Sequence, residues 1–477
     1  MEENVKTRLA SIFGERVSFA TAVRDQHSHG EGYQKRGIPD AVVFAESTDD
    51  VVALVNLCRE HGVAIVPFGA GSSLEGHVAA VQGGVTLSLA RMNRILDVSA
   101  ESLDCRVEAG VTQDQLNADI RAEGLFFSVD PGADATIGGM AATRASGTNA
   151  VRYGTMRENT LGLSVVTPSG EIIHTGGRAR KSATGFDLTR LYVGSEGTLG
   201  VITEIQLRLQ GIPEAIVAAT CQFSNFEDAI STVSAALQGG LRLARIELLD
   251  EVQMRASIGY SKLEGFEEKP TLFLEFHGSD ASVREDAQAM EDLALSFNGT
   301  HFFHARRPED RAILWKARHN CYYAAKWLAP GKDSMGTDAC VPISEFAACI
   351  NETKQDARRS GLLVSLVGHV GDGNFHLGIL HNPEDKAETE RAEALAARVS
   401  ERAIRYGGTC SGEHGVGSHK RQFMYAEHGV AIEVMRAIKA ALDPTGIMNP
   451  GKLLPEPSSS NAQNTPKYPG MRLTERF

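Results

Sequence analysis

The chain has 477 residues, of which 42% are hydrophobic and 23% charged, and a formal net charge of −12. This length predicts about two to four domains of ordinary globular composition, and because no apolar run is long enough to cross a bilayer we expect no membrane-spanning segment. The negative charge, without any basic stripe, argues against nucleic acid as a partner.

The cysteines are scattered and form no Cys-x-x-Cys pair: Cys58, Cys105, Cys221, Cys321, Cys340, Cys349 and Cys410. This pattern predicts reduced, buried thiols in an intracellular compartment and argues against an iron–sulfur cluster. The N-terminal stretch lacks both an apolar h-region and an Arg/Ser-rich transit pattern, so we expect no targeting segment. The expected location is cytoplasmic, and a peripheral position at the inner membrane stays open.

The first elements form a short helix with a polar loop, and then a β-α-β unit. The helix and loop are expected within residues 1–37. A buried strand over 41–45, a helix with Thr48 as its N-cap and Gly62 as its left-handed end, and a strand over 64–67 make up the unit.

A loop of small residues, PFGAGSSLEGH, follows at 67–77. It lacks the third glycine of the dinucleotide fingerprint and the Lys-Ser/Thr of a P-loop. Its backbone N–H groups and two serine hydroxyls could still cradle a pyrophosphate. A glycine-rich surface turn is the alternative that one such loop leaves open.

A second loop of this kind spans residues 130–154 and shows no helical or strand period. Small side chains of this sort let a flat, elongated cofactor lie against the backbone. A strand over 106–110 and a helix from Thr112 to Gly124 precede the loop, and a hairpin over 161–175 follows it.

A third glycine-rich turn, at 194–200, leads into an alternating strand over 201–209, and Gly211-Ile212-Pro213 marks an expected domain boundary. Beyond it, strands such as 271–277 alternate with long charged helices such as 281–295 and 384–405, the pattern of an α+β domain. The expected divisions are an N-terminal helix and loop, a cofactor domain, an α+β domain, a C-terminal segment and a polar tail: 1–37, 38–211, 212–410, 411–455 and 456–477.

The stretch GHVGDGNFH at 368–376 places His369 and His376 on either side of a tight Gly-Asp-Gly turn, where they can face each other. Glu413 would add a carboxylate to a metal site with open positions, and His414 beside it would be available as a base. Ordinary hydrogen-bonded histidines in a glycine-rich bend are the alternative. The spacing alone favours that alternative, because it matches no zinc pattern.

Six stretches, taken together and in order, resemble the FAD-linked D-2-hydroxy-acid dehydrogenases of the vanillyl-alcohol-oxidase type, with the D-lactate dehydrogenase (cytochrome) branch as the nearest match. They are the loops at 67–77 and 130–154, GSEGTLGVITE, GHVGDGNFH, GTCSGEHGVG and DPTGIMNPGKLL. Six motifs in order are far more specific than any one alone. With them, a metal site becomes the favoured interpretation of the two histidines.

The resemblance implies an α+β fold with a two-subdomain FAD-binding domain of PCMH type, an α+β cap over the substrate and a C-terminal segment that returns to the flavin domain. It also implies which residues bind FAD: Pro67, Gly69, Ala70, Gly71, Ser72, Gly76, Pro131, Gly132, Thr136, Ile137, Gly138, Gly139, Gly147 and Ile202.

By the same resemblance, His369, His376 and Glu413 bind a divalent metal, zinc or manganese, His414 is the base, and Arg318 clamps the substrate carboxylate. The implied activity is oxidation of D-lactate or a similar short D-2-hydroxy acid to the 2-oxo acid. Hydride passes to flavin N5, and an external acceptor other than oxygen, such as a cytochrome, a quinone or an electron-transfer flavoprotein, takes up the electrons. The resemblance leaves a homodimer open.

This sequence departs from relatives that oxidise D-2-hydroxyglutarate. Where those relatives carry a lysine and an asparagine, it has Gly336 and Gly378, which argues against a second substrate carboxylate. His77 lies in the pyrophosphate loop but is offset from the usual attachment place, so we expect non-covalent FAD. D-2-hydroxyglutarate, a longer D-2-hydroxy acid, or a non-catalytic flavin-binding subunit of a redox complex stay as alternatives.

Overall fold

The computed structural model of the chain describes residues 1–32 and 36–456 and separates into two compact units. The first unit is built from three stretches of chain: Met1–Ser146, Gly154–Ile212 and the part that begins at Glu413. The second unit is built from two: Gly147–Tyr153 and Pro213–Gly412. The expectation about a polar tail beyond Glu456 concerns residues outside the described ranges.

A four-stranded sheet in the order β1-β2-β4-β3 opens the first unit. Its strands are β1 (Val17–Ser18), β2 (Ala41–Phe44), β3 (Ile65–Phe68) and β4 (Val85–Ser88). The β2–β4 and β4–β3 pairs are parallel, and β1 lies antiparallel to β2. The N-terminal region holds more structure than the one helix and loop expected: α1 (Glu3–Phe13), η1 (Gly14–Arg16), β1 and α2 (Thr21–Gln26).

Helix α3 (Thr48–His61) connects β2 to β3 and corrects one detail of the sequence analysis. Its N-cap is Ser47, whose hydroxyl accepts a hydrogen bond from the amide of Asp50, and Thr48 is already helical. Both residues are good caps, so local sequence could not separate them. Gly62 ends the helix in the left-handed conformation, as expected.

A five-stranded antiparallel sheet in the order β5-β6-β10-β8-β9 makes the second layer of the first unit. Its strands are β5 (Ile95–Ser99), β6 (Asp104–Glu108), β8 (Thr160–Val166), β9 (Ile172–Gly176) and β10 (Val201–Arg208). The expected hairpin is the β8–β9 pair. A separate two-stranded pair joins β7 (Leu125–Phe126) to β11 (Gln210–Gly211).

The glycine-rich stretch 130–154 is not the irregular loop that we expected. It contains α5 (Ile137–Thr143) and α6 (Ala150–Tyr153). Ile137, Met140 and Ala141 of α5 are buried with helical spacing. The helix is so short, and its neighbours in sequence are so small, that this spacing could not be recognised in the sequence. The remaining helices of the first unit are α4 (Gln113–Ile120), η2 (Arg121–Glu123), α7 (Met156–Asn159), α8 (Leu188–Tyr192), η3 (Lys420–Phe423), α16 (Met424–His428) and α17 (Ala431–Leu442).

An eight-stranded sheet forms the second unit, in the order β15-β12-β14-β13-β18-β19-β16 with β17 paired to β19. Its strands are β12 (Ala215–Gln222), β13 (Leu243–Leu249), β14 (Thr271–Gly278), β15 (Thr300–Ala305), β16 (Asp333–Gly336), β17 (Ala339–Cys340), β18 (Leu363–His369) and β19 (Asn374–His381). Every pair is antiparallel.

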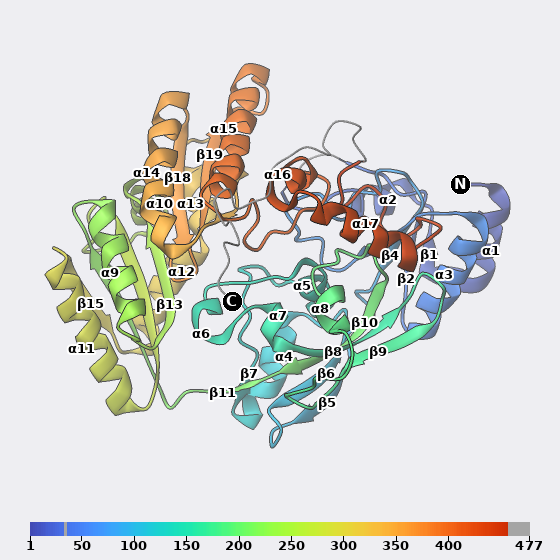
Figure 1. Ribbon diagram of the computed structural model, residues 1–477, viewed down its shortest axis with the longest axis horizontal. Coiled ribbons are helices and arrows are strands. Elements are labelled where there is room, and N and C mark those ends of the chain that lie inside the picture. The colour runs from blue at the N-terminus through green and yellow to red at the C-terminus, as the bar shows by residue number, and fades with distance from the viewer. Residues whose placement is uncertain (33–35, 457–477) are drawn as a thin grey trace, which may run out of the picture. The chain divides into compact units, whose positions relative to one another are not determined.

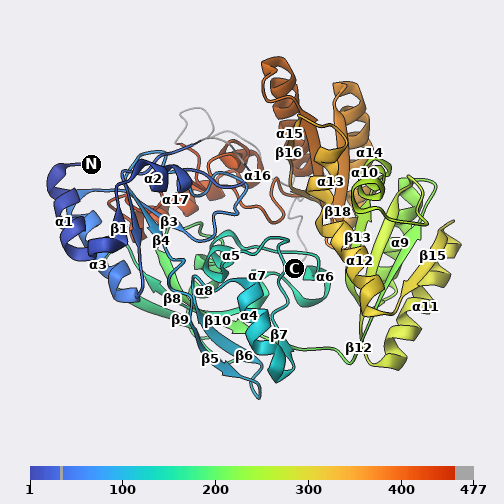
Figure 2. The ribbon, with the colours of Figure 1, turned by 180° about the vertical axis from the view of Figure 1, so that it is seen from behind.

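Four helices cover one face of this sheet, as Figures 1 and 2 show: α9 (Phe226–Gln238), α11 (Asp280–Ser296), α14 (Ile343–Ser360) and α15 (Lys386–Arg405). They share a core with alternate residues of the strands, among them Ile246, Leu272 and Phe375. Apart from α6, which lies within the segment Gly147–Tyr153, the other helices of the unit are α10 (Glu251–Ser261), α12 (Pro308–His319) and α13 (Cys321–Trp327). They pack on the opposite face over a small cluster that includes Leu249, Phe273 and Leu314.

This alternation matters because successive strand residues point to opposite faces of a sheet. Ile246 and Phe375 face the larger core, so Glu247 and His376 face the other way. His369 is paired with Glu247 in the register of β18 and β13, and so it lies on this second face as well. Among the described residues no helix is long and apolar enough to cross a membrane, and all seven cysteines are free thiols.

Candidate active site

A cavity in the first unit is lined by three separate glycine-rich loops. They are the loop after β3, the segment around α5 and the turn before β10. The loops approach one another so closely that a Cβ on Gly69 would lie 2.1 Å from the hydroxyl of Thr136, and one on Gly138 would lie 2.6 Å from the side chain of Ala109. Backbone, and not side-chain bulk, therefore shapes the walls of this cavity.

Ten of the residues that we expected to bind FAD line this cavity: Pro67, Gly69, Ala70, Gly71, Ser72, Pro131, Thr136, Gly138, Gly139 and Ile202. Four others do not line it: Gly76, Gly132, Ile137 and Gly147. The side chain of Ile137 is fully buried in the core, and Gly147 belongs to the second unit.

Two polar side chains in the cavity wall suit a polar ligand. Within the described part of the chain, the hydroxyl of Ser73 and both ring nitrogens of His77 are buried without a hydrogen-bond partner. His77 Nε2 lies 3.4 Å from a carboxylate oxygen of Glu196, but without hydrogen-bonding geometry. Buried polar groups normally have partners, so a wall of backbone amides with these two groups fits a dinucleotide cofactor such as FAD.

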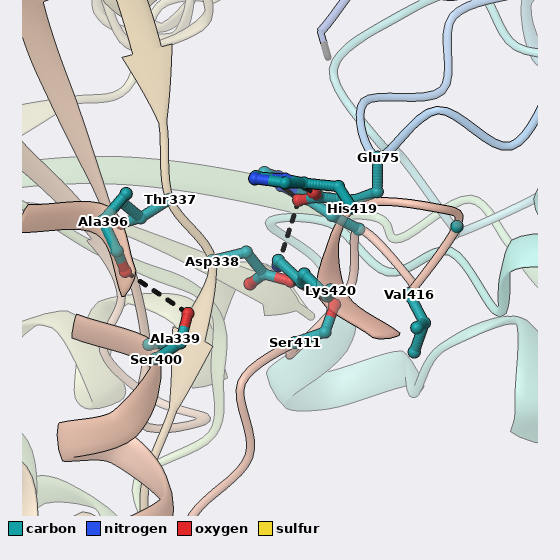
Figure 3. Close-up of polar contacts among 12 residues, drawn as sticks. Glu75, Thr337, Asp338, Ala339, Ala396, Ser400, Ser411, Val416, His419 and Lys420 are labelled. Carbon is teal, nitrogen blue, oxygen red and sulfur yellow. Dashed lines mark hydrogen bonds and ion pairs between the residues drawn. The ribbon is translucent and has the colours of Figure 1, made fainter. Parts of the chain in front are cut away.

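Glu413 and His414 also line this cavity. His414 Nδ1 lies 3.5 Å from a carboxylate oxygen of Glu75, which is 3% exposed. Glu75 Oε2 lies 2.7 Å from His419 Nδ1, and Glu75 Oε1 lies 3.0 Å from Lys420 Nζ. Figure 3 shows these three side chains together. Burial alone would raise the pKa of Glu75, but the charge of Lys420 and the neighbouring histidines hold that pKa well below its usual range. The carboxylate beside His414 is therefore charged.

The two histidines of the Gly-Asp-Gly hairpin lie together in the second unit, as the sequence predicted. His369 ends β18 and His376 lies in β19, on the strand pair that the turn connects. Their ring centroids are 5.4 Å apart and the ring planes meet at 82°. The hairpin thus presents two imidazoles to the same volume.

A buried carboxylate, Glu247 of β13, holds His369. It lies directly opposite His369 in the strand register, and its Oε1 is 2.7 Å from His369 Nδ1. Its Oε2 accepts a hydrogen bond from Arg318 Nε at 2.8 Å and forms an ion pair with Arg318 Nη2 at 2.6 Å. Burial would raise the pKa of Glu247, but His369 and Arg318 outweigh that effect and lower the pKa. Glu247 is thus a carboxylate shared between two expected site residues.

Backbone and a second carboxylate hold His376. Its Nδ1 lies 3.0 Å from the carbonyl oxygen of Thr337 and 3.8 Å from Asp338 Oδ1. Asp338 is 1% exposed and accepts hydrogen bonds from Asn374 at 2.7 Å and from Ser411 at 2.8 Å. Figure 3 shows Asp338 and Ser411 beside each other. With Nδ1 of each ring engaged in this way, Nε2 is the nitrogen suited to a metal, and two imidazoles fit zinc or manganese.

The expected metal ligands are divided between the units: His369 and His376 belong to the second, and Glu413 to the first. The two glycines expected to govern substrate choice are both in the second unit. Gly336 of β16 and Gly378 of β19 lie directly opposite each other. Gly378 follows His376 by two residues and so shares its face of the sheet.

Sequence reasoning missed Glu75, Glu247 and Asp338. One signal was available for Glu247, because LARIELL is an otherwise apolar strand with Arg245 and Glu247 on the same face, and a buried charge needs partners. Neither Glu75 nor Asp338 stands out in its loop. The segment Gly147–Tyr153 was also missed as a part of the second unit, where Arg245 donates a 2.9 Å hydrogen bond to Asn149.

Comparisons with known proteins agree with this architecture. Residues 212–453 match the family described as "FAD linked oxidases, C-terminal domain", and residues 39–176 match the "FAD binding domain" family. The chain therefore belongs to the FAD-linked oxidase family and is an FAD-dependent oxidoreductase. The expected fold, a PCMH-type FAD-binding domain joined to an α+β domain, is confirmed.

Among its relatives is a Danio rerio protein named "Probable D-lactate dehydrogenase, mitochondrial", which is 48% identical over 95% of this chain and 92% of its own length. An Arabidopsis thaliana protein named "D-lactate dehydrogenase [cytochrome], mitochondrial" is 44% identical over 92% of this chain and 78% of its own length. The solved structure of 4-ethylphenol oxidase from Gulosibacter chungangensis shares the fold, with a TM-score of 0.77, 18% identity and coverage of 95% of this chain and 97% of that one.

Proposed function

We propose that the chain oxidises D-lactate, or a similar short D-2-hydroxy acid, to the corresponding 2-oxo acid. The similarity to two proteins named D-lactate dehydrogenase, at 48% and 44% identity over more than nine-tenths of the chain, carries the proposal. The hairpin histidines and Arg318 support it, because a 2-hydroxy acid offers both a carboxylate and a hydroxyl to be held.

The roles follow from the chemistry of each side chain. Arg318 binds the substrate carboxylate in a charge-assisted fork. His369, His376 and Glu413 hold a divalent metal, zinc or manganese. His414 accepts the proton of the substrate hydroxyl, and the charged Glu75 beside it favours the imidazolium that results. When bound, FAD supplies the hydride acceptor and the metal supplies a Lewis acid.

The facing glycines support a short side chain on the substrate. Neither Gly336 nor Gly378 carries a charged side chain on the face that carries His376. The polar atoms nearest to a Cβ on Gly378 are the hydroxyls of Ser365 and Ser334, and a second carboxylate buried there without a cationic partner would be costly. D-lactate is therefore preferred to D-2-hydroxyglutarate.

We further propose that FAD is held without a covalent bond and that a cytochrome-type acceptor reoxidises it. The cavity offers FAD a wall made mainly of backbone, and the Arabidopsis relative carries the word cytochrome in its name. The flavin should leave the protein on heat or acid denaturation. Flavin that stays with the denatured chain would contradict this and implicate His77.

The decisive experiment is anaerobic mixing of the flavin-loaded protein with D- and L-2-hydroxy acids while the flavin absorbance is followed. Rapid bleaching by D-lactate, slower bleaching by D-2-hydroxyglutarate and none by L-lactate are expected. No bleaching by any of these acids would overturn the proposed activity, and faster bleaching by D-2-hydroxyglutarate at equal subsaturating concentration would overturn the preference. Reoxidation of the reduced protein by cytochrome c, by a quinone analogue and by an electron-transfer flavoprotein then identifies the acceptor class.

A further inference from the structure

Glu247 is a buried charge to which the proposed chemistry assigns no part. It lies in the middle of β13 and its residue is 1% exposed. It faces away from the core under α9, α11, α14 and α15, on the side of the sheet that also carries His369 and His376. A buried carboxylate is costly unless its oxygens are fully used, which raises the question of what this one is used for.

Its two oxygens serve two different partners. Oε1 lies 2.7 Å from His369 Nδ1, and Oε2 accepts a hydrogen bond from Arg318 Nε at 2.8 Å and lies 2.6 Å from Arg318 Nη2 in an ion pair. An ionised carboxylate can only accept, so the proton of the His369 ring must be on Nδ1. The carboxylate therefore fixes both the tautomer of His369 and the plane of the Arg318 guanidinium.

We propose that Glu247 is a positioning residue that sets the metal ligand His369 and the carboxylate clamp Arg318 together. The inference rests on the proposed function for the roles of those two side chains. A histidine that donates Nδ1–H to a carboxylate presents Nε2 to a metal with increased basicity, and such outer partners strongly affect metal affinity. Through Arg318, the same carboxylate aligns the group that receives the substrate carboxylate.

A second buried carboxylate on the same face of the sheet provides a matched control. Glu275 of β14 is 5% exposed and lies 2.8 Å from His277 Nε2 and 3.5 Å from Arg245 Nε. Tyr153 engages the other ring nitrogen, His277 Nδ1, at 2.7 Å. Both nitrogens of His277 are thus used within the protein, so this Glu-His-Arg group is structural and binds no metal.

The test compares Glu247→Gln with Glu275→Gln in the FAD-loaded protein. Glutamine has one acceptor oxygen for two donors: either its NH₂ faces His369 and forces the proton onto Nε2, or it faces Arg318 and displaces the guanidinium. Zn²⁺ affinity, measured by competition with a chromogenic chelator, should fall about 10–100-fold in Glu247→Gln. The KM for D-lactate should rise. FAD content should stay at the wild-type level, and Glu275→Gln should keep the wild-type Zn²⁺ affinity.

Equal Zn²⁺ affinity in wild type and Glu247→Gln, an equal loss in Glu275→Gln, or no Zn²⁺ binding by the wild type would each overturn the inference. The zinc measurement needs no turnover. Flavin that no 2-hydroxy acid bleaches, with the expected zinc difference, would therefore remove the proposed function and the clamp role of Arg318, and would leave the positioning of His369 by Glu247 standing. Should Glu247→Gln not fold, Glu247→Asp against Glu275→Asp gives the same comparison, because aspartate is too short to reach both partners.

Discussion

The two units shape their functional regions by different means. In the first unit, close backbone approach shapes the cavity, as at Gly69, where a Cβ would lie 2.1 Å from the Thr136 hydroxyl. In the second unit, the functional groups are polar side chains, and the buried carboxylate of Glu247 holds His369 and Arg318 in place. An added methyl group should therefore harm the first unit, and a change of charge or hydrogen bonding at constant size should harm the second.

His414 tests the limit of this comparison, because its side chain is proposed to act as the base although it lies in the unit whose cavity is shaped by close backbone approach. His414→Asn should slow flavin reduction by D-lactate by about 10²–10⁴-fold, the usual worth of a general base. FAD and metal contents should stay unchanged, since asparagine is smaller than histidine and adds no bulk to the cavity. Single-turnover stopped-flow measurements with cofactor analysis would check this. Normal reduction, or loss of FAD in step with activity, would contradict the assigned role.

Arg318 tests the importance of charge in the second unit. Arg318→Met keeps the length of the side chain but leaves Glu247 without its cation, and breaking a buried pair in this way should lower the free energy of unfolding by about 3 kcal/mol. Chemical denaturation would measure it. Arg307→Met removes an exposed arginine from its pair with Asp310 and should lower the free energy of unfolding much less, because solvent screens exposed pairs. A similar loss of unfolding free energy in both variants would show that the buried pair contributes no more to stability than the exposed one.

Glu413 tests whether a carboxylate from the first unit joins the histidines of the second. Glu413→Gln replaces an anionic ligand by a weaker neutral one, so metal affinity should fall by more than about tenfold, which is the least that loss of an outer partner costs. Added Zn²⁺ or Mn²⁺ should partly restore turnover. Glu427→Gln is the matched control, because Glu427 also precedes a histidine and is 4% exposed in the same unit. Metal loss in the control, or none in Glu413→Gln, would speak against the divided site.

Gly71 tests the role of backbone in the first unit. It adopts φ +75°, and an added Cβ would lie 2.7 Å from the ring of Phe68. The left-handed conformation costs a non-glycine residue about 1–2 kcal/mol, so Gly71→Ala should weaken FAD binding by about 5–30-fold if that whole cost is lost from the binding free energy. Gly124→Ala incurs the same backbone cost in open space, at φ +70°, and should keep FAD affinity. Equal affinities in a flavin fluorescence titration would count against backbone control.

Elements with strong local signals could be predicted from the sequence. The hairpin around Gly371-Asp372-Gly373 places its histidines as expected, Gly62 ends α3, and the Thr112 hydroxyl caps α4 by accepting a hydrogen bond from the amide of Gln115. Turns and caps depend on residues a few positions apart, which is why they can be read from sequence. Where two neighbouring residues could serve equally well, as at Ser47 and Thr48, the local signal could not decide.

By itself, the sequence determined the family and the secondary-structure elements that carry the site residues, because six ordered motifs and short-range capping and turn preferences are written directly in the chain. Only the tertiary structure decided the partners of those residues. Glu247 meets Arg318 and His369 across 71 and 122 positions of sequence, and the segment Gly147–Tyr153 joins a sheet whose strands begin at Ala215. Such contacts follow from strand order and register, and these depend on how all the apolar faces of a unit are buried at once.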